Sequence, residues 1–220
     1  ENEKNTTLKS MHEYFRNDSG TYQNEYTGYF KGKNLILFMA ESYNMIAVNK
    51  ELTPTLYKLT NSGFVFNNFY SPVHLSTTGG EFQATTGLVP TQSTMSIWKK
   101  EKPTLLYGLG NAFGKQNYRV QSYHNWTYTY YKRNVTMSTL GFNNYKGCGN
   151  GLENLMSCKW LPSDIEMINV TTPDYLNQEG NFVTYYVTVG GHSPYNSSSN
   201  IAKKYLNQVE GDYSSIVKYY

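Results

Sequence analysis

The chain has 220 residues, the length of one ordinary domain or of part of a larger one. Its 19 Lys and Arg against 16 Asp and Glu give a net charge of +3, which is too mild to indicate a nucleic-acid partner. The longest strongly apolar run, Leu35 to Ala40, is far shorter than the roughly 20 residues that a membrane helix needs. No apolar leader opens the chain, so we expect any signal or membrane anchor to lie outside this sequence.

The first half of the chain contains an N-terminal polar stretch and the start of an alternating pattern. Residues 1–30 are polar without clean periodicity, which predicts a linker or a loosely attached arm, and residues 31–220 form the second unit. Leu35–Ala40 is continuously apolar, which is typical of a strand buried on both faces. Thr53 and Pro54 then indicate the start of a helix that ends at Gly63, and the aromatic run Phe64–Tyr70 predicts a second strand.

The second half continues the alternation of strands and helices. The pattern predicts a helix over Pro103–Phe113, a third strand over Tyr118–Tyr123, a helix opened by Ser163 and a fourth strand over Phe182–Val189. This order predicts an α/β fold with a mostly parallel sheet and helices on both faces. The chain's last residues, 214–220, have the pattern of an amphipathic helix that stops without a cap, so we expect the native protein to continue beyond Tyr220.

Two cysteines, Cys148 and Cys158, lie ten residues apart in a stretch rich in Gly and Asn. They are either unlinked thiols or a disulfide, which would stabilise the fold by roughly 2.5–3 kcal/mol through chain entropy. Their spacing does not fit a zinc site. Six Asn-x-Ser/Thr sequons also occur, although such triplets arise by chance in a chain of this composition: they begin at Asn5, Asn17, Asn125, Asn134, Asn169 and Asn196. We expect an extracytoplasmic location, and in that case a disulfide.

Chemically active side chains follow the predicted strands at their carboxyl ends, where ligands bind in open α/β sheets. Glu41 ends the first strand, His124 ends the third, and His192 follows the fourth. Thr77 and Thr78 lie in a Gly-rich turn before a predicted helix, where free amides and the helix dipole favour a phosphate or an alkoxide. Each residue alone has an ordinary explanation as a solvated or capping group, but together they predict a site.

The same residues resemble a known family. The stretch Lys33–Ser42 resembles the opening strand of the lipoteichoic acid synthases, which are phosphoglycerol transferases of the sulfatase-like branch of the alkaline phosphatase superfamily. The run from Thr77 to Phe82 is similar to the family's nucleophile turn, in which a threonine stands five residues before the Phe of a Glu-Phe pair. By that resemblance Thr77, and not Thr78, is the nucleophile.

Two further motifs of the family are present and one is absent. The family places a histidine, an aromatic residue seven positions later and an arginine nine positions later around the phosphoglycerol group; here these are His124, Tyr131 and Arg133. The aromatic residue is usually Trp, so Tyr131 departs from the pattern. The turn that contains His192 resembles the family's histidine-x-proline turn, whose His faces the phosphate. The Asp-His pair that completes the family's metal site does not occur in these 220 residues.

The resemblance implies a metal-dependent phosphoglycerol transferase on the extracellular face of the cell membrane of a Gram-positive-type bacterium. It implies that Glu41 and Thr77 ligate Mn²⁺ or Mg²⁺ and that Thr77 and His192 are catalytic. It also implies that His124, Tyr131, Arg133 and His192 bind a phosphatidylglycerol-type lipid headgroup, whose glycerophosphate passes to a growing polymer. Two alternatives stay open: a phosphoethanolamine transferase or sulfatase of the same superfamily, and a non-catalytic module that binds teichoic acid or glycan through its aromatic residues.

Overall fold

The computed structural model describes residues 3–18, 20–71 and 75–220. It divides into two compact units, Glu1–Lys33 and Asn34–Tyr220. The first unit carries one helix, α1 (Thr6–Asn17), whose N-cap Asn5 accepts the amides of Thr7 and Leu8. Residues 1, 2 and 19 of the predicted arm lie outside the described residues. Nowhere in the described ranges does a helix combine the length and apolar character needed to cross a bilayer.

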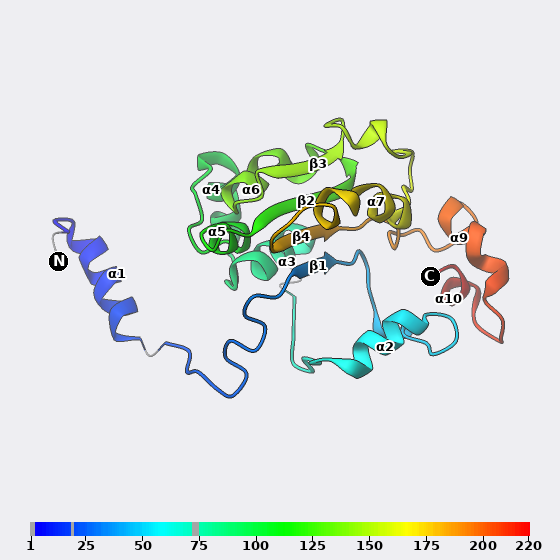
Figure 1. Cartoon of the computed structure of the whole chain (residues 1–220), viewed down its shortest axis with the longest axis horizontal. Helices are drawn as coiled ribbons and strands as arrows, with labels where there is room; N and C mark the ends of the chain where they lie inside the picture. The colour runs from blue at the N-terminus through cyan, green and yellow to red at the C-terminus, as the bar shows by residue number, and fades with distance from the viewer. Residues whose placement is uncertain (1–2, 19, 72–74) are drawn as a thin grey trace. The chain divides into compact units, whose positions relative to one another are not determined.

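The second unit is built on a four-stranded parallel sheet, visible in the middle of Figure 1. Its strands are β1 (Leu35–Met39), β2 (Arg119–Thr127), β3 (Asn144–Cys148) and β4 (Phe182–Val187), in the spatial order β1-β4-β2-β3. All three pairings are parallel. The sheet is therefore the mostly parallel sheet that the alternating pattern predicts.

Helices cover both faces of this sheet. The helices of the second unit are α2 (Pro54–Ser62), α3 (Ser76–Thr86), α4 (Gln92–Glu101), α5 (Leu109–Gly114), α6 (Arg133–Thr139), α7 (Asp164–Thr171), α8 (Pro173–Leu176), α9 (Asn200–Tyr205) and α10 (Ser215–Tyr219). On one face Tyr185 packs in a core with residues of α3, α4 and α6. On the other face Tyr186 packs with residues of α7 and α8.

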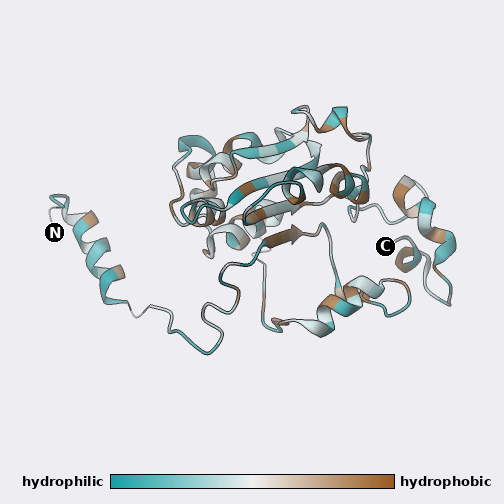
Figure 2. Cartoon of the chain, viewed as in Figure 1, coloured by the Kyte–Doolittle hydropathy of each residue, from teal (hydrophilic) through white to brown (hydrophobic). Residues whose placement is uncertain are grey.

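The alternation of side chains along a strand explains these two cores, because successive residues point to opposite faces. Val183, Tyr185 and Val187 of β4 face the first core, while Phe182 and Tyr186 face the second. Every residue of β4 is buried, as expected for a central strand of a doubly covered sheet. Figure 2 also shows hydrophobic colour on its neighbour β1, but β1 lies at the edge of the sheet and Ile36 and Phe38 are 44% and 50% exposed. The prediction that this apolar run is buried on both faces is therefore wrong, because one of its faces is left uncovered.

The predicted strand over Phe64–Tyr70 is wrong. These residues form no strand, and Phe66 and Tyr70 are 79% and 74% exposed. An apolar run forms a strand only where it finds a ladder partner, and here the fourth strand is instead β3, at the far edge next to β2. The sequence of β3, Asn-Tyr-Lys-Gly-Cys, has too few apolar residues to indicate a strand.

The predicted helix over Pro103–Phe113 is correct only in its second half. The structure has α4 before it, which the pattern did not indicate, and α5 begins only at Leu109. Gly110 in α5 lies so close to the segment after α6 that an added Cβ would stand 2.7 Å from the Leu140 carbonyl oxygen. The glycines that weaken the helical pattern therefore allow α5 to approach this segment closely.

Candidate functional site

A cavity lies beyond the carboxyl ends of β1, β2 and β4. All six predicted site residues contribute to its wall, together with two tryptophans, a further tyrosine and the end of β4. The lining residues are Glu41, Thr77, His124, Trp126, Tyr130, Tyr131, Arg133, Trp160, Val187, Thr188, Val189 and His192. Parallel strands deliver their carboxyl ends to one edge, so residues up to 151 positions apart meet there.

Thr77 belongs to the first turn of α3. This helix begins after Leu75 without a side-chain cap, so its first amides have no acceptor from a capping side chain. The Thr78 hydroxyl donates to the Leu75 carbonyl at 3.4 Å, and Thr78 does not line the cavity. Thr77 does line it, and its hydroxyl has no hydrogen-bond partner among the described residues. Residues 72–74 of the predicted turn lie outside those residues.

Glu41 is fixed where β1 leaves the sheet. Its backbone amide donates to the Thr188 hydroxyl at 2.9 Å, and the Thr188 amide donates to the Met39 carbonyl at 3.1 Å. The Ser42 hydroxyl donates to Glu41 Oε1 at 2.8 Å, which leaves Oε2 of the carboxylate open. The end of β4 therefore holds the backbone that carries this carboxylate.

Arg133 forms a buried network beneath the cavity. Its Nε donates to both carboxylate oxygens of Glu81, at 3.0 and 3.3 Å, and both side chains are only 2% exposed. Its Nη1 donates to His124 Nε2 at 3.1 Å, while Nη2 has no hydrogen-bond partner within the described ranges. Burial alone would lower the pKa of Arg133, but the charge and hydrogen bond of Glu81, together with Tyr145 and Tyr185, outweigh it and the pKa is raised. The guanidinium therefore stays charged and keeps one nitrogen for an anion.

His124 is neutral in this arrangement. Arg133 can only donate, so Nε2 of His124 accepts, and Nδ1 carries the proton and donates to the Val187 carbonyl at 3.0 Å. Burial, with the charge of Arg133, lowers the pKa of His124 to about 3. Both ring nitrogens thus bind other groups of the protein. These contacts indicate that His124 orients Arg133 and does not itself bind substrate through a ring nitrogen.

Tyr131 lines the cavity and contacts two cations with its ring. Its ring centroid is 5.4 Å from the Arg133 guanidinium carbon and 5.7 Å from Lys99 Nζ, distances at which a ring face attracts a cation. Tyr131 and Lys132 both have left-handed backbone, with φ of 55° and 61°. Such conformations cost about 1 kcal/mol or more in residues with a Cβ, and they tend to occur at functional sites.

His192 also lines the cavity, from the turn after β4. Its Nδ1 contacts the Ser193 carbonyl at 2.6 Å, which leaves Nε2 for a ligand. The imidazole meets Trp160 edge to face with ring centroids 5.0 Å apart, and Trp160 meets Trp126 in the same way at 4.9 Å. The sequence reasoning missed these two tryptophans and Glu81 as parts of the site, because no spacing ties them to the cavity.

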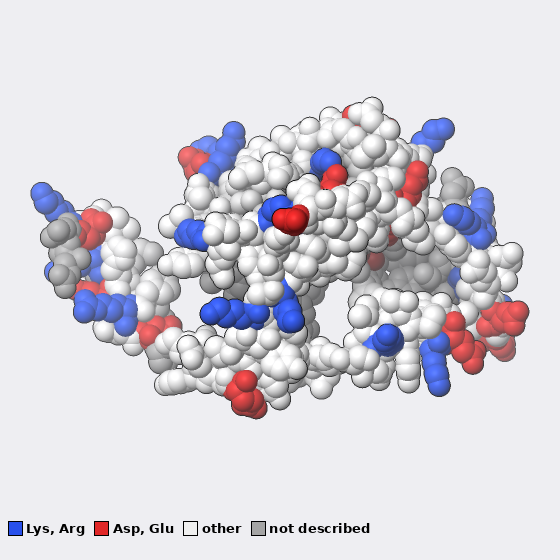
Figure 3. Space-filling view, viewed as in Figure 1, with Lys and Arg blue, Asp and Glu red and all other residues white. Residues whose placement is uncertain are grey.

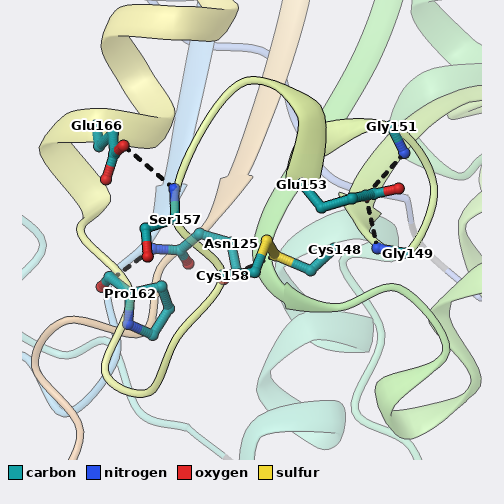
Figure 4. The surroundings of a disulfide bond; sticks show 9 residues. All are labelled: Asn125, Cys148, Gly149, Gly151, Glu153, Ser157, Cys158, Pro162 and Glu166. Atoms are coloured by element: carbon teal, nitrogen blue, oxygen red, sulfur yellow. Dashed lines mark hydrogen bonds between the residues drawn. A yellow bond between two sulfur atoms is a disulfide. The ribbon is translucent and has the colours of Figure 1, made fainter.

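Cys148 and Cys158 form a disulfide, which ties the end of β3 to the segment that leads to Trp160. Figure 4 shows Asn125 beside this bond and close to Pro162. In the same view Glu153 accepts the amides of Gly149 and Gly151, and Glu166 accepts the amide of Ser157. The loop between the cysteines is therefore held at both ends.

The donors for a metal ion are few. Glu41 and Thr77 offer one carboxylate and one hydroxyl, oxygen ligands of the kind that Mn²⁺ and Mg²⁺ prefer. Within residues 3–18, 20–71 and 75–220, no group of three His, Cys, Asp or Glu side chains could hold an ion. The two residues fit such a cation only as part of a larger ligand shell.

The comparisons with known proteins agree with this geometry. The model of the family named Sulfatase matches residues 33–219. The chain belongs to the sulfatase family. This sulfatase-family chain matches no curated protein. It does match solved structures of the same fold, at low identity.

One of these structures is the lipoteichoic acid synthase LtaP from Listeria monocytogenes, with a TM-score of 0.71 and 22% identity over 96% of this chain and 54% of that chain. Another is a protein in the alkaline phosphatase superfamily from Vibrio parahaemolyticus, with a TM-score of 0.62 and 20% identity over 90% of this chain and 48% of that one. The sulfatase-family chain thus spans about half the length of the structures it resembles.

Proposed function

We propose that the protein is a metal-dependent phosphoglycerol transferase of the lipoteichoic acid synthase type. It would move glycerophosphate from a phosphatidylglycerol-type lipid to a polymer through a phosphothreonine intermediate. The observation that supports this most is the single cavity shared by Glu41, Thr77, Tyr131, Arg133 and His192. This cavity brings together a candidate nucleophile at a helix N-terminus, Thr77, the buried guanidinium of Arg133 and a candidate acid–base group, His192. We propose that the phosphate of the lipid headgroup binds among them.

The residues divide the chemistry among them. The Thr77 oxygen, deprotonated before the reaction, forms a bond to phosphorus while the phosphorus–oxygen bond to diacylglycerol breaks, and His192 donates a proton to the leaving oxygen. Arg133 Nη2 and the first amides of α3 hold the phosphate oxygens, because both are donors placed for an anion. In the second step a glycerol hydroxyl of the polymer attacks phosphorus, His192 takes its proton, and the Thr77 oxygen is released.

Glu41 and Thr77 would hold Mn²⁺ or Mg²⁺ together with ligands from elsewhere in the protein, and this ion, when bound, would lower the pKa of the threonine hydroxyl. We infer an extracellular location, at a membrane surface reached through an anchor outside this sequence. The disulfide is consistent with an oxidising compartment.

The decisive variants are Thr77→Ala and its neighbour Thr78→Ala in the intact protein. With a phosphatidylglycerol analogue that releases a fluorescent diacylglycerol, we expect Thr77→Ala to lose at least about 10³-fold in turnover, because it removes the attacking oxygen. We expect Thr78→Ala to stay within about twofold, since its hydroxyl is bound to the Leu75 carbonyl. Full activity of the Thr77→Ala protein would show that another group attacks.

The choice of donor separates the alternatives. A phosphatidylethanolamine analogue that is cleaved in preference to the phosphatidylglycerol one would indicate a phosphoethanolamine transferase, and cleavage of an aryl sulfate would indicate a sulfatase. Binding of glycerophosphate polymer without cleavage of any donor, in the presence of Mn²⁺, would indicate a non-catalytic module.

A further inference from the structure

Asp164 links the ends of two neighbouring strands. This residue begins α7, and its side chain is half-buried. Oδ1 accepts the side-chain amide of Asn125 at 2.8 Å and the backbone amide of Val189 at 2.9 Å, and Oδ2 accepts the backbone amide of Gly190 at 2.9 Å. Asn125 belongs to β2, directly after His124, while Val189 and Gly190 follow β4. One side chain therefore fixes the distance between these two strand ends.

The turn held by Asp164 has little freedom to move. A Cβ at Gly190 would collide with the Asp164 carboxylate, and a Cβ at Gly191 would collide with the Glu41 carbonyl oxygen. The turn then closes through the His192 amide, which donates to the Val189 carbonyl at 2.9 Å. The turn therefore packs against Asp164 of α7 and against Glu41, which follows β1.

His192 depends on this turn for its position, because its own side chain is exposed and few contacts hold it. Its ring packs against Trp160, which stands four residues before Asp164 in the same segment. That segment begins at Cys158, so the disulfide to Cys148 anchors it to β3. The residues from Cys158 to Asp164 therefore touch His192 at its ring and fix the turn at its backbone.

We propose that Asp164 is a positioning residue for His192: its carboxylate sets the turn after β4 so that the imidazole lines the same cavity as Thr77. The inference rests on the proposed function, in which His192 acts on the phosphate. Asp164 itself does not line the cavity, so it acts through the turn and not on the substrate.

Two variants disturb the contact from opposite sides in the intact protein. Asp164→Asn replaces one acceptor oxygen by an amide group that would oppose the backbone or side-chain amides around it. Gly190→Ala leaves the carboxylate in place but pushes the turn away from it. Their matched controls are Asp174→Asn, which alters a carboxylate that accepts from Tyr123 and Lys146, and Gly114→Ala, where an added Cβ meets nothing within 4 Å.

Two readouts separate positioning from simple destabilisation. The first is kcat and KM with the phosphatidylglycerol analogue, where we expect both test variants to lose about 10- to 100-fold in kcat with KM changed less than about threefold, since a displacement of about 1 Å costs this much. The second is amide hydrogen exchange, where we expect at least about tenfold faster exchange at Val189 and Gly190 but unchanged exchange along β2 and β4. Both controls should keep wild-type kcat.

The proposal is overturned if kcat of both test variants stays within twofold of wild type, or if exchange rises equally across the whole sheet. If Asp164→Asn fails to fold, Gly190→Ala decides by the same two readouts. A wild-type protein that cleaves no lipid analogue contradicts the proposed function, and the exchange measurement then still decides whether Asp164 holds the turn.

Discussion

Arg133 carries a full positive charge in the interior, at a place where the protein has to compensate it. A buried guanidinium is stable only when its N–H groups have acceptors, and Glu81 and His124 supply them. The remaining nitrogen, Nη2, has no hydrogen-bond partner among the described residues, and Arg133 lines the cavity. Glu81 and His124 therefore hold the Arg133 side chain in place, so an anion bound by it would not have to order a long side chain.

Removing the charge of Glu81 should destabilise the protein severely. We expect Glu81→Gln to lower the free energy of unfolding by about 3–5 kcal/mol, because a buried Arg133 would lose its counter-charge. Urea unfolding of the intact protein measures this. The matched control is Glu101→Gln. Glu101 and its partner Lys100 are 59% and 81% exposed, so this substitution should change the free energy of unfolding by less than about 1 kcal/mol. Equal stability of the two variants would contradict a structural role for the Glu81–Arg133 pair.

His124 should make stability depend on pH. Folded His124 stays neutral down to its pKa of about 3, whereas in the unfolded chain it takes up a proton near pH 6.5. Between these values the unfolded state binds the extra proton, so stability falls as the pH is lowered, by at most about 1.4 kcal/mol per pH unit from this group. We expect urea unfolding at pH 7, 6 and 5 to show this loss.

The variant His124→Gln provides the comparison for that measurement. A glutamine can accept from Arg133 and donate to the Val187 carbonyl, but it does not titrate. The stability of this variant should therefore fall less steeply below pH 6 than that of the wild type. Parallel curves for the two proteins would show that His124 takes no part in the pH dependence.

At the scale of elements, apolar patterning predicts three of the four strands of the sheet and misses β3. β1, β2 and β4 are predicted from their runs of apolar and β-branched residues, and the Ser163 cap of α7 is present, with its hydroxyl accepting the Glu166 amide. β3 is not predicted because its sequence has few apolar residues, and of one face only Tyr145 and Gly147 are buried. The aromatic run over Phe64–Tyr70 misleads because an apolar residue need not be buried.

The disulfide is an element whose removal can be measured directly. Replacing both Cys148 and Cys158 by Ser should lower the free energy of unfolding by roughly 2.5–3 kcal/mol, since the unfolded chain regains the entropy of an eleven-residue loop. It should also lower turnover, because the segment carrying Trp160 and Asp164 loses its anchor. Reduction of the wild type should reproduce both effects, and reduction of the double variant should change nothing. Unchanged unfolding of reduced wild type would contradict a stabilising role for the bond.

At the scale of the whole molecule, topology determines how much of the site can be predicted. Residues that directly follow parallel strands, such as Glu41 and His192, converge because those ends share one edge. Glu81, Trp160 and Asp164 could not be assigned in this way, since their roles depend on which side chain packs against them across the chain. The charges outside the site carry little information: Lys, Arg, Asp and Glu are interspersed over the face drawn in Figure 3.

The strand order also has a consequence for how the protein is made. Among the described residues β1 pairs with β4 alone, and the paired residues Leu35 and Val183 are 148 positions apart. At a synthesis rate of about 5–20 residues per second, β1 emerges from the ribosome roughly 7–30 s before its partner exists. During that interval its apolar side chains have no ladder to join, and loop closure over such a distance is slow. The strand that delivers Glu41 can therefore join its ladder only after β4 has been made.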